Sequence, residues 1–320
     1  MGENSNQQTA VNGQYHVPVM LSESIEALNI RPDGAYVDVT FGGGGHSRAI
    51  LDCLGPEGRL YAFDQDEDAL RNALDDPRFT LINENFRHLR NFLRLYGVRQ
   101  VDGLLADLGV SSHQFDVAER GFSTRFDGEL DLRMDRRNGL MAKDLVNALD
   151  EEALARLLKL YGELPNARQM ARAIVKARVE HEIATTADLK EAVAHHLPRG
   201  MENKYLAMLF QALRIEVNGE LEALKEMLLQ AQQILAPEGR LVVISYHSLE
   251  DRLVKNFMRS GNFEGAIEKD FYGNPLSPMK MLGKCTASDS EVAANSRARS
   301  AMLRVGMPRQ VQVEKLVFEY

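Results

Sequence analysis

The chain has 320 residues, 44% of them hydrophobic, and a net charge of −8, so it can bury a full core and is not disordered. No run of about 18 apolar residues occurs, and residues 1–14, predicted to be a flexible polar tail, lack the basic start and apolar stretch of a signal peptide. We therefore expect a cytoplasmic protein that does not span a membrane, built as one large domain or one and a half.

The first chemical signal in the chain is a run of glycines behind an apolar strand. Gly42 to Gly45 directly follow the strand predicted over residues 35–40, and a helix is predicted over residues 46–54. Glycine has no Cβ, so the main chain can take positive φ and come close to a ligand in front of the helix N-terminus. The glycines alone also fit a turn that binds nothing.

The surrounding acids indicate which ligand this turn would hold. Asp64 ends the next predicted strand about 20 residues later, at the spacing where an acid usually binds the two ribose hydroxyls of a nucleoside. Ser47 stands where a dinucleotide motif needs its last glycine, and Asp38 would repel a pyrophosphate but attract an ammonium group. The pattern favours S-adenosylmethionine, with a nicotinamide dinucleotide as the alternative.

Strands and helices then alternate as in α/β proteins. Strands are predicted over 60–64, 79–82 and 103–108, with helices over 67–75 and 87–96 between them. Parallel strands bind ligands at their carboxyl ends.

Three side chains are therefore expected at the carboxyl edge of the sheet. Phe86 follows the third strand and Asp107 closes the fourth, so both are expected beside Asp64. Phe86 would either stack on an adenine ring or pack in the core.

The middle of the chain breaks this alternation. Residues 131–235 are predicted to be almost all helical, and a buried strand over 239–245 with a helix over 250–258 restores the first pattern. We expect residues 15–130 and 214–320 to form one α/β domain and residues 131–213 to be a helical domain inserted into it.

Basic residues gather in two places. Arg168, Arg172 and Lys176 recur every four residues of a predicted helix, with Arg178 beside them. Residues 280–309 hold six more basic side chains: Lys280, Lys284, Arg297, Arg299, Arg304 and Arg309. Such patches can bind phosphates, or they are a solvated helix face and a charged surface loop.

Two loops at the predicted edge of the sheet carry further polar groups. Residues 107–114 run from Asp107 to Gln114 and supply a carboxylate, hydroxyls, an imidazole and an amide. His247 follows the later strand. It would either face the pocket as a base or a substrate contact, or pack while Ser248 caps the next helix.

The two cysteines lack the spacing of a zinc or redox site, and Cys53 is predicted to pack on the apolar side of the helix over 46–54. We expect no metal.

Longer motifs along the chain resemble one known family, the bacterial 16S ribosomal RNA cytidine-N4 methyltransferases known as RsmH or MraW. The resemblance covers nearly the whole chain. It rests on His16-Val-Pro-Val-Met-Leu, Phe41-Gly-Gly-Gly-Gly-His-Ser, Asp107-Leu-Gly-Val-Ser-Ser, Glu119-Arg-Gly-Phe-Ser, Leu130-Asp-Leu-Arg-Met-Asp, Phe210-Gln-Ala-Leu-Arg-Ile, Ser245-Tyr-His-Ser-Leu-Glu-Asp-Arg and Arg297-Ala-Arg-Ser.

The resemblance implies a class I methyltransferase fold with an inserted helical domain, S-adenosylmethionine as methyl donor and a cytidine in the decoding region of 16S ribosomal RNA as acceptor. The partner is then the RNA or the small ribosomal subunit, and the protein is a monomer or a homodimer. The implied cofactor contacts are Gly44, Gly45, His46, Asp64, Phe86, Asp107 and Gln114.

The mechanism expected for such an enzyme is direct in-line transfer to cytosine N4, with one group accepting the departing proton. Asp107 and His247 are the catalytic candidates. A nicotinamide oxidoreductase and a non-catalytic RNA-binding protein remain as other classes at this point.

Overall fold

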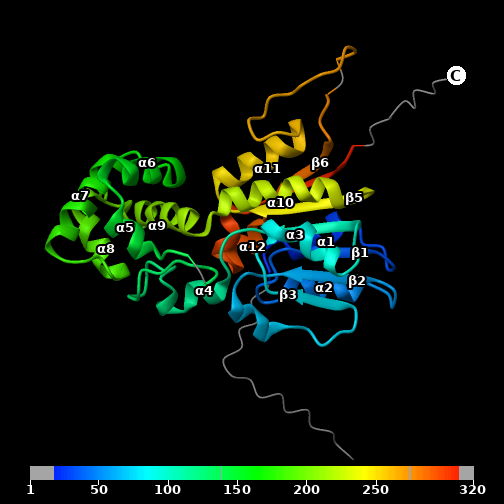
Figure 1. The fold of residues 1–320 in the computed structure, drawn as a ribbon, viewed down its shortest axis with the longest axis horizontal. Coiled ribbons are helices and arrows are strands. Elements are labelled where there is room, and N and C mark those ends of the chain that lie inside the picture. The colour runs from blue at the N-terminus through cyan, green and yellow to red at the C-terminus, as the bar shows by residue number, and fades with distance from the viewer. Residues whose placement is uncertain (1–17, 138, 274, 310–320) are drawn as a thin grey trace, which may run out of the picture.

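The structure is a computed structural model that describes residues 18–137, 139–273 and 275–309. The predicted flexible tail over residues 1–14 lies outside the described residues. Figure 1 shows a sheet flanked by helices and, to one side of it, a separate group of helices. The helix α9 (Glu202–Asn218) lies in that group, and α10 (Glu220–Ile234) follows it in the chain and lies along the sheet.

The sheet is built from seven strands. Their bounds are β1 Ala35–Asp38, β2 Arg59–Phe63, β3 Phe79–Ile82, β4 Val101–Asp107, β5 Leu235–Ser245, β6 Met279–Thr286 and β7 Met302–Pro308. Their order is β3-β2-β1-β4-β5-β7-β6, and the first five of these run parallel while β7 is antiparallel to both neighbours. Each strand predicted from the sequence is present, with small differences at its ends.

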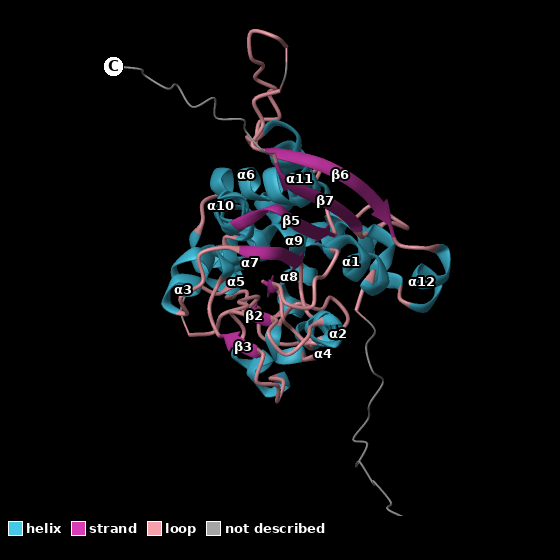
Figure 2. Cartoon of the chain, turned by 90° about the vertical axis from the view of Figure 1, so that its right-hand side faces the viewer, coloured by secondary structure: helices cyan, strands magenta, loops and turns pink. Residues whose placement is uncertain are grey.

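Helices cover both faces of the sheet, as Figure 2 shows. Their bounds are α1 Leu21–Leu28, α2 Gly45–Cys53, α3 Leu89–Leu95, α11 Ser248–Ser260 and α12 Asp289–Ala294. Leu104 and Val243 pack in one core with α3, α10 and α11, whereas Leu105 and Val242 pack in another with α1 and α2. Because both faces are covered, the central residues of these strands, 104–106 and 241–244, are all apolar.

The separate helical group has a core of its own. It contains α5 Ala142–Ala148, α6 Glu151–Gly162, α7 Ala167–Glu180, α8 Thr186–Val193 and α9. This core also takes in Phe122 and Leu130, which precede the expected boundary at residue 131. The group lies between β4 and β5 in the sequence, although these two strands pair directly. The domain boundaries at 131 and 213 stay a prediction.

Short elements complete the chain. They are α4 Ser112–Asp116 and the 3₁₀ turns η1 Glu67–Asn72, η2 Phe86–His88, η3 Ala118–Arg120, η4 Ala194–His196 and η5 Ser296–Ser300. The helical segment predicted over 67–75 is a shorter 3₁₀ helix, η1, which buries only Ala69 and so has no apolar stripe to pack as an α-helix.

Three other expectations need correction. The segment 280–309 is not a surface loop, since it contains β6 and β7, and the basic side chains of β6 point outward from an edge strand. Cys53 is exposed rather than packed, because Ile50 and Leu51 provide the buried side of α2. No helix in the described part of the chain is long and apolar enough to cross a membrane.

Two arginines counted in the basic patches are structural. Arg178 donates to the carbonyl oxygens of Val146 and Leu149 at the end of α5, at 2.7 and 2.6 Å. Arg304 is only 5% exposed and pairs through two hydrogen bonds of 2.7 and 2.9 Å with Asp251.

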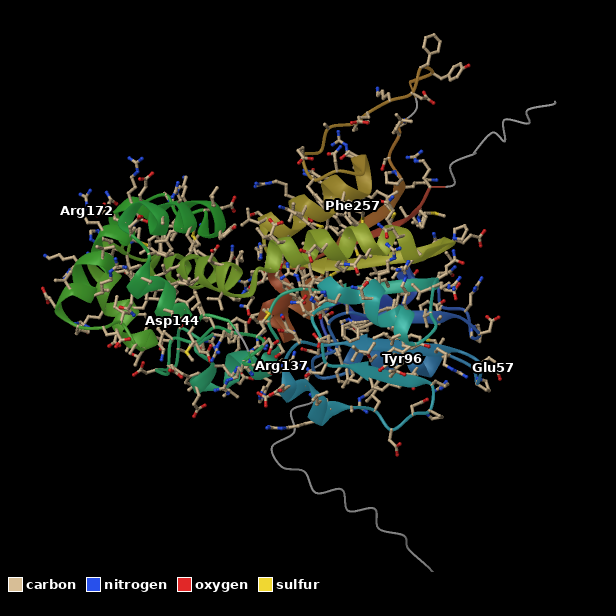
Figure 3. The ribbon with its side chains drawn as sticks, in the orientation of Figure 1. Glu57, Tyr96, Arg137, Asp144, Arg172 and Phe257 are labelled. Atoms are coloured by element: carbon tan, nitrogen blue, oxygen red, sulfur yellow. The ribbon has the colours of Figure 1, made fainter. Side chains whose placement is uncertain are left out.

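Other members of the patches remain available to a partner. Arg168, Arg172 and Lys176 stay exposed on α7, at the outer end of the helical group where Figure 3 labels Arg172.

The Arg304–Asp251 pair gives a test of the packing between β7 and α11. Arg304→Met leaves the Asp251 carboxylate beside apolar surface without its partner, so we expect the free energy of unfolding in urea to fall by about 1–3 kcal/mol. Lys280→Met, which removes an exposed charge from the neighbouring strand, is the control. Equal stability of the two variants would contradict a structural role for this pair.

Candidate active site

The glycine loop joins β1 to α2 at the carboxyl edge of the sheet. Gly42 and Gly44 have φ of +50° and +75°, which only glycine adopts without strain. A Cβ on Gly45 would lie 2.2 Å from the Cγ of Pro18, so the neighbouring chain requires this glycine. A Cβ on Gly43 would meet nothing within 4 Å, and the loop is therefore open to a ligand at this position.

The Asp38 carboxylate binds the chain on both sides of this loop. Its side chain is 1% exposed, one oxygen accepts from the Ser47 hydroxyl at 2.7 Å, and the other accepts from the Thr40 amide at 3.1 Å. Burial raises the pKa of the Asp38 carboxyl. The expectation that Asp38 attracts a ligand ammonium group needs correction, because both oxygens already bind the protein.

Asp64 lies at the end of β2 and faces the loop. Its carboxylate accepts from the amide of Gly42 at 2.7 Å and from the amide of Asp66 at 2.9 Å. Burial raises the pKa of Asp64 to about 6. The predicted ribose acid therefore also holds the glycine loop, and it is partly exposed.

His46 and Asp107 meet where β1 and β4 end. The Nδ1 atom of His46 lies 3.7 Å from one oxygen of Asp107, and the hydroxyl of Tyr246 donates to the other at 2.6 Å. Burial raises the pKa of Asp107 to about 6, against the pull of His46 and the Tyr246 hydrogen bond. The Nε2 atom of His46 is buried and has no hydrogen-bond partner among the described residues.

Gln114 is buried beside the carboxyl edge of the sheet, called the rim below, but both ends of its side-chain amide bind protein groups. The oxygen accepts from the amide of Ser111 at 3.0 Å and the nitrogen donates to Asp66 at 2.7 Å. Ser111 and Gln114 thereby form the capping box that starts α4.

Arg120 is a site residue that sequence reasoning missed. It is 1% exposed, pairs with Asp66 at 2.8 Å and Asp68 at 2.9 Å, and donates to the carbonyl oxygens of Arg133 and Met134. One arginine thus connects the rim behind β2 to the segment that enters the helical group. The available signal was its place in the Glu119-Arg-Gly-Phe-Ser motif, which had been given no role.

A crevice runs along the rim between the sheet and the helical group. Phe86 lines it and also packs against the apolar core, and stacking of this ring on an adenine stays a prediction. The other lining residues are Thr40, Gln65, Asn85, Leu108, Gly109, Met134, Asn218, Glu220, Ala223, Leu224 and Glu250.

His247 lies on the next loop, at the start of α11. Its Nδ1 atom accepts from the amide of Glu250 at 3.5 Å, so His247 and not Ser248 caps the helix. Its Nε2 atom lies 3.2 Å from the Glu250 carboxylate, although the hydrogen-bond angle is poor. Ser248 instead donates to Glu163 of the helical group.

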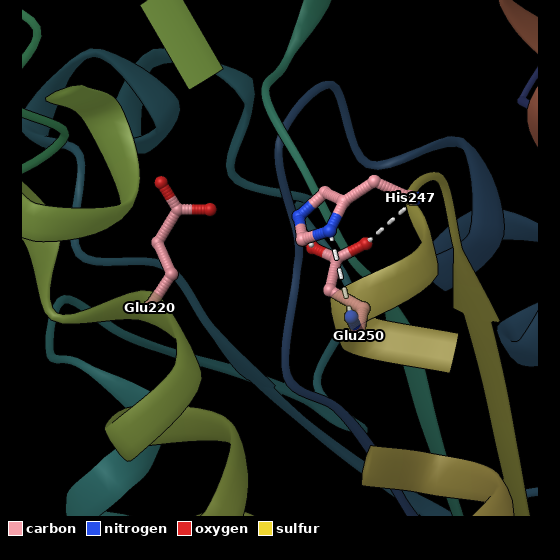
Figure 4. Close-up of side chains that lie close together, drawn as sticks. All are labelled: Glu220, His247 and Glu250. Atoms are coloured by element: carbon pink, nitrogen blue, oxygen red, sulfur yellow. Dashed lines mark hydrogen bonds and ion pairs between the residues drawn. The ribbon is translucent and has the colours of Figure 1, made fainter. Parts of the chain in front are cut away.

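Figure 4 shows Glu220 opposite this pair, with all three potential ligand atoms within 4.8 Å of one another. Glu220 is already neutralised by two hydrogen bonds of 2.7 and 2.8 Å from Arg214. Burial opposes ionisation of Glu250, but His247 and Arg214 outweigh it and lower the pKa of this carboxyl. The prediction that the protein holds no metal stays a prediction.

The fold and this rim together define the class of protein. A parallel sheet in the order β3-β2-β1-β4-β5, extended by a reversed β7, with a glycine loop after β1 and an acid after β2, is the class I methyltransferase fold. The crevice lies between the ends of β1 and β4, where the strand order reverses, as in other open α/β sheets. The sequence profile of the MraW methylase family matches residues 13–308, and the chain belongs to this family.

Proteins of the same family are highly similar along their whole length. A protein named Ribosomal RNA small subunit methyltransferase H from Flavobacterium johnsoniae is 59% identical over 293 residues, which cover 91% of this chain and 97% of that protein. One of the same name from Phocaeicola vulgatus is 57% identical, with 92% and 98% covered. The family predicted from the sequence is confirmed.

Solved structures are more distant. A structure titled as an rRNA methylase from Streptococcus thermophilus matches with a TM-score of 0.42 and 12% identity, over 93% of this chain and 100% of that one. A likeness this weak does not bear on function.

The raised pKa of Asp107 gives a pH test. In the folded protein this carboxyl keeps its proton up to about pH 6, whereas in the unfolded chain it loses the proton near pH 4. The free energy of unfolding therefore falls as the pH rises between these two values. Asp107→Asn cannot ionise. Its free energy of unfolding should therefore rise relative to the native sequence by roughly 1–3 kcal/mol from pH 4 to pH 7.

Urea titrations at a series of pH values measure this difference. Asp52→Asn, on the exposed side of α2, is the control. It shows how much of the change with pH in the free energy of unfolding comes from removing any carboxylate. A difference that stays constant or falls with pH contradicts the burial of Asp107.

Proposed function

We propose that this protein transfers the methyl group of S-adenosylmethionine to N4 of a cytidine in the decoding region of 16S ribosomal RNA. Its membership of the MraW methylase family, at 57–59% identity to proteins named Ribosomal RNA small subunit methyltransferase H, is the observation that carries this proposal. The substrate would be the RNA or the small subunit itself. Such a substrate implies a cytoplasmic reaction.

The residues at the rim fit the proposed donor. The open main chain at Gly43 allows close approach, Gly44 and Gly45 adjoin it as the other proposed donor contacts of the loop, and the Asp64 carboxylate is suited to accept from two ribose hydroxyls. When bound, S-adenosylmethionine supplies an electrophilic methyl group on a sulfonium centre.

The other proposed donor contacts supply stacking and charge. Phe86 presents a ring to the crevice for the adenine, and Asp107 offers a negative charge close to His46. Gln114 would act mainly by holding the loop after β4, since both ends of its amide bind protein groups.

The chemistry requires a proton acceptor. The amino lone pair of cytosine is delocalised into the ring, so the enzyme must align N4 with the methyl carbon and accept a proton from it. Asp107, with a pKa near 6, can accept that proton at neutral pH, and Tyr246 holds its carboxylate in place.

His247 is the second candidate for this role. Its Nδ1 atom caps α11 and its Nε2 atom faces Glu250, so it has less freedom to act as a base. We assign it to contact the acceptor base from the loop after β5.

The acceptor cytidine must be unpaired or turned out of a helix to reach the crevice. The helical domain over residues 131–213 is suited to hold the surrounding RNA, because Arg168, Arg172 and Lys176 stay exposed on one face of α7.

The decisive experiment incubates the purified protein with small-subunit particles and donor labelled in its methyl group. We expect the label in N4-methylcytidine at one position of the 16S RNA, mapped by nuclease digestion and mass spectrometry. Label on a base carbon or on protein overturns the proposed chemistry. RNA binding without transfer of label instead indicates a non-catalytic RNA-binding protein.

Asp64 tests the donor site. Protonation turns the carboxylate from an acceptor into a donor towards the ribose, so S-adenosylhomocysteine affinity should fall as the pH drops below about 6. Asp64→Asn should weaken binding at pH 7.5 by about 1–3 kcal/mol and should show a flatter pH profile.

Calorimetry from pH 5 to pH 8 measures both effects. Glu57→Gln is the control, because Glu57 is exposed and lies at the side of the molecule away from the helical group, as Figure 3 shows. Unchanged affinity of Asp64→Asn at every pH means that the ribose binds elsewhere.

A further inference from the structure

A second hollow lies on the surface between the end of α3 and the end of α10. Every residue that lines it is either cationic or neutral. The residues are Arg90, Arg94, Gly97, Val98, Arg99, Gln233 and Ile234. Its position and its charge are both unlike those of the crevice that holds the proposed active site.

The three arginines carry charges that the protein does not neutralise. In the described ranges, none of them has a carboxylate oxygen within 4.0 Å, in a chain whose net charge is −8. The guanidinium of Arg90 bonds only the side-chain amide of Gln233. Arg87, one turn earlier, instead pairs with Glu226 through two hydrogen bonds of 3.0 and 2.8 Å.

This arrangement costs stability. Arg90 and Arg94 stand four residues apart on α3, so like charges face each other at a cost of about 0.2–0.5 kcal/mol. The helix dipole favours Arg94 in the last turn but disfavours Arg90 in the first turn. The helix dipole therefore does not explain why an arginine stands at position 90, whereas an anion bound between the arginines does.

The hollow lies at the opposite edge of the sheet from the active site. Arg99 lies two residues before the start of β4, and Ile234 directly precedes β5, so the hollow is at the edge where these parallel strands start. α10 has 15 residues and leads from Glu220 in the crevice to Ile234 in the hollow. At a rise of about 1.5 Å per residue, the two sites are about 20 Å apart.

We infer that this hollow is a phosphate-binding site formed by Arg90, Arg94 and Arg99, and that its main ligand is the phosphate backbone of the substrate RNA, about 20 Å from the methylated base. Arginine presents a fork of donors that matches phosphate oxygens. A free phosphate compound has the same chemistry and is the other source. For RNA, the inference rests on the proposed function.

The distance between the hollow and the proposed active site gives a testable prediction. A short oligonucleotide that carries only the target cytidine does not reach a site about 20 Å away, whereas a whole subunit does. The triple variant Arg90→Gln, Arg94→Gln, Arg99→Gln should therefore raise KM for small-subunit particles at least tenfold without changing kcat. KM for the short oligonucleotide and affinity for S-adenosylhomocysteine should stay unchanged.

The salt dependence of binding is the second measurement. The slope of log Kd against log salt for 16S RNA should become shallower by about 0.7–0.9 for each phosphate contact that is lost. Arg59→Gln is the control, because Arg59 starts β2 at the same edge of the sheet but donates to the carbonyl oxygens of Pro56 and Gly58. Arg94→Gln with Arg99→Gln, both exposed, replaces the triple variant if that variant does not fold.

Calorimetry with pyrophosphate separates the two ligand sources. A shallower salt slope with a higher particle KM supports RNA as the ligand. Loss of pyrophosphate binding with unchanged RNA binding supports a free phosphate compound. If the variant changes none of these, the inference is wrong even where cytidine methylation is established. If the protein methylates no cytidine, the salt slope and the pyrophosphate titration still test the hollow.

Discussion

A buried carboxylate at the end of β1 is the constraint on which the proposed site depends. Asp38 holds Ser47 at the start of α2 and Thr40 at the start of the glycine loop, and the Thr40 hydroxyl accepts from the amide of Asp107 at 2.6 Å. These bonds tie the ends of β1 and β4 together below the crevice. A buried charge is expensive unless such partners satisfy it. The polar groups above it therefore have a rigid base, which pre-organised catalysis requires.

Arg120 provides the corresponding link between the two parts of the molecule. Its guanidinium joins Asp66 and Asp68 behind β2 to the main chain at Arg133 and Met134, where the chain enters the helical group. Asn218 strengthens the same junction by accepting from the amide of Met134 at 2.7 Å. In Figure 3 the junction is close to Arg137, between the helical group and the sheet. These contacts fix the position of the helical group against the edge of the sheet.

The distribution of charge is compatible with the RNA substrate that we propose, although the chain has a net charge of −8. Several arginines of its motifs pair with carboxylates of the protein itself, as Arg120 does with Asp66 and Arg214 with Glu220. Among the described residues, Arg168 and Lys176 on α7 and the arginines around the hollow at the end of α3 have no ion pair with a carboxylate, whereas Arg172 pairs with Glu151 at 3.2 Å. Net charge is therefore a poor guide to nucleic-acid binding here, because a local cluster sets the field that a phosphate meets.

The sequence by itself determined the alternation of strands and helices, the glycine loop, the position of Asp64 after β2 and the family, because these follow from local apolar patterns and from motifs of contiguous residues. Only the tertiary structure decided the roles of Asp38, Gln114, Arg120 and Arg304. Whether a charged side chain faces a ligand or an opposite charge depends on partners far along the chain, as with Arg304 and Asp251. The strands β6 and β7 were missed for the same reason, since the pairing of β7 with β5 and of β6 with β7, rather than local propensity, stabilises them.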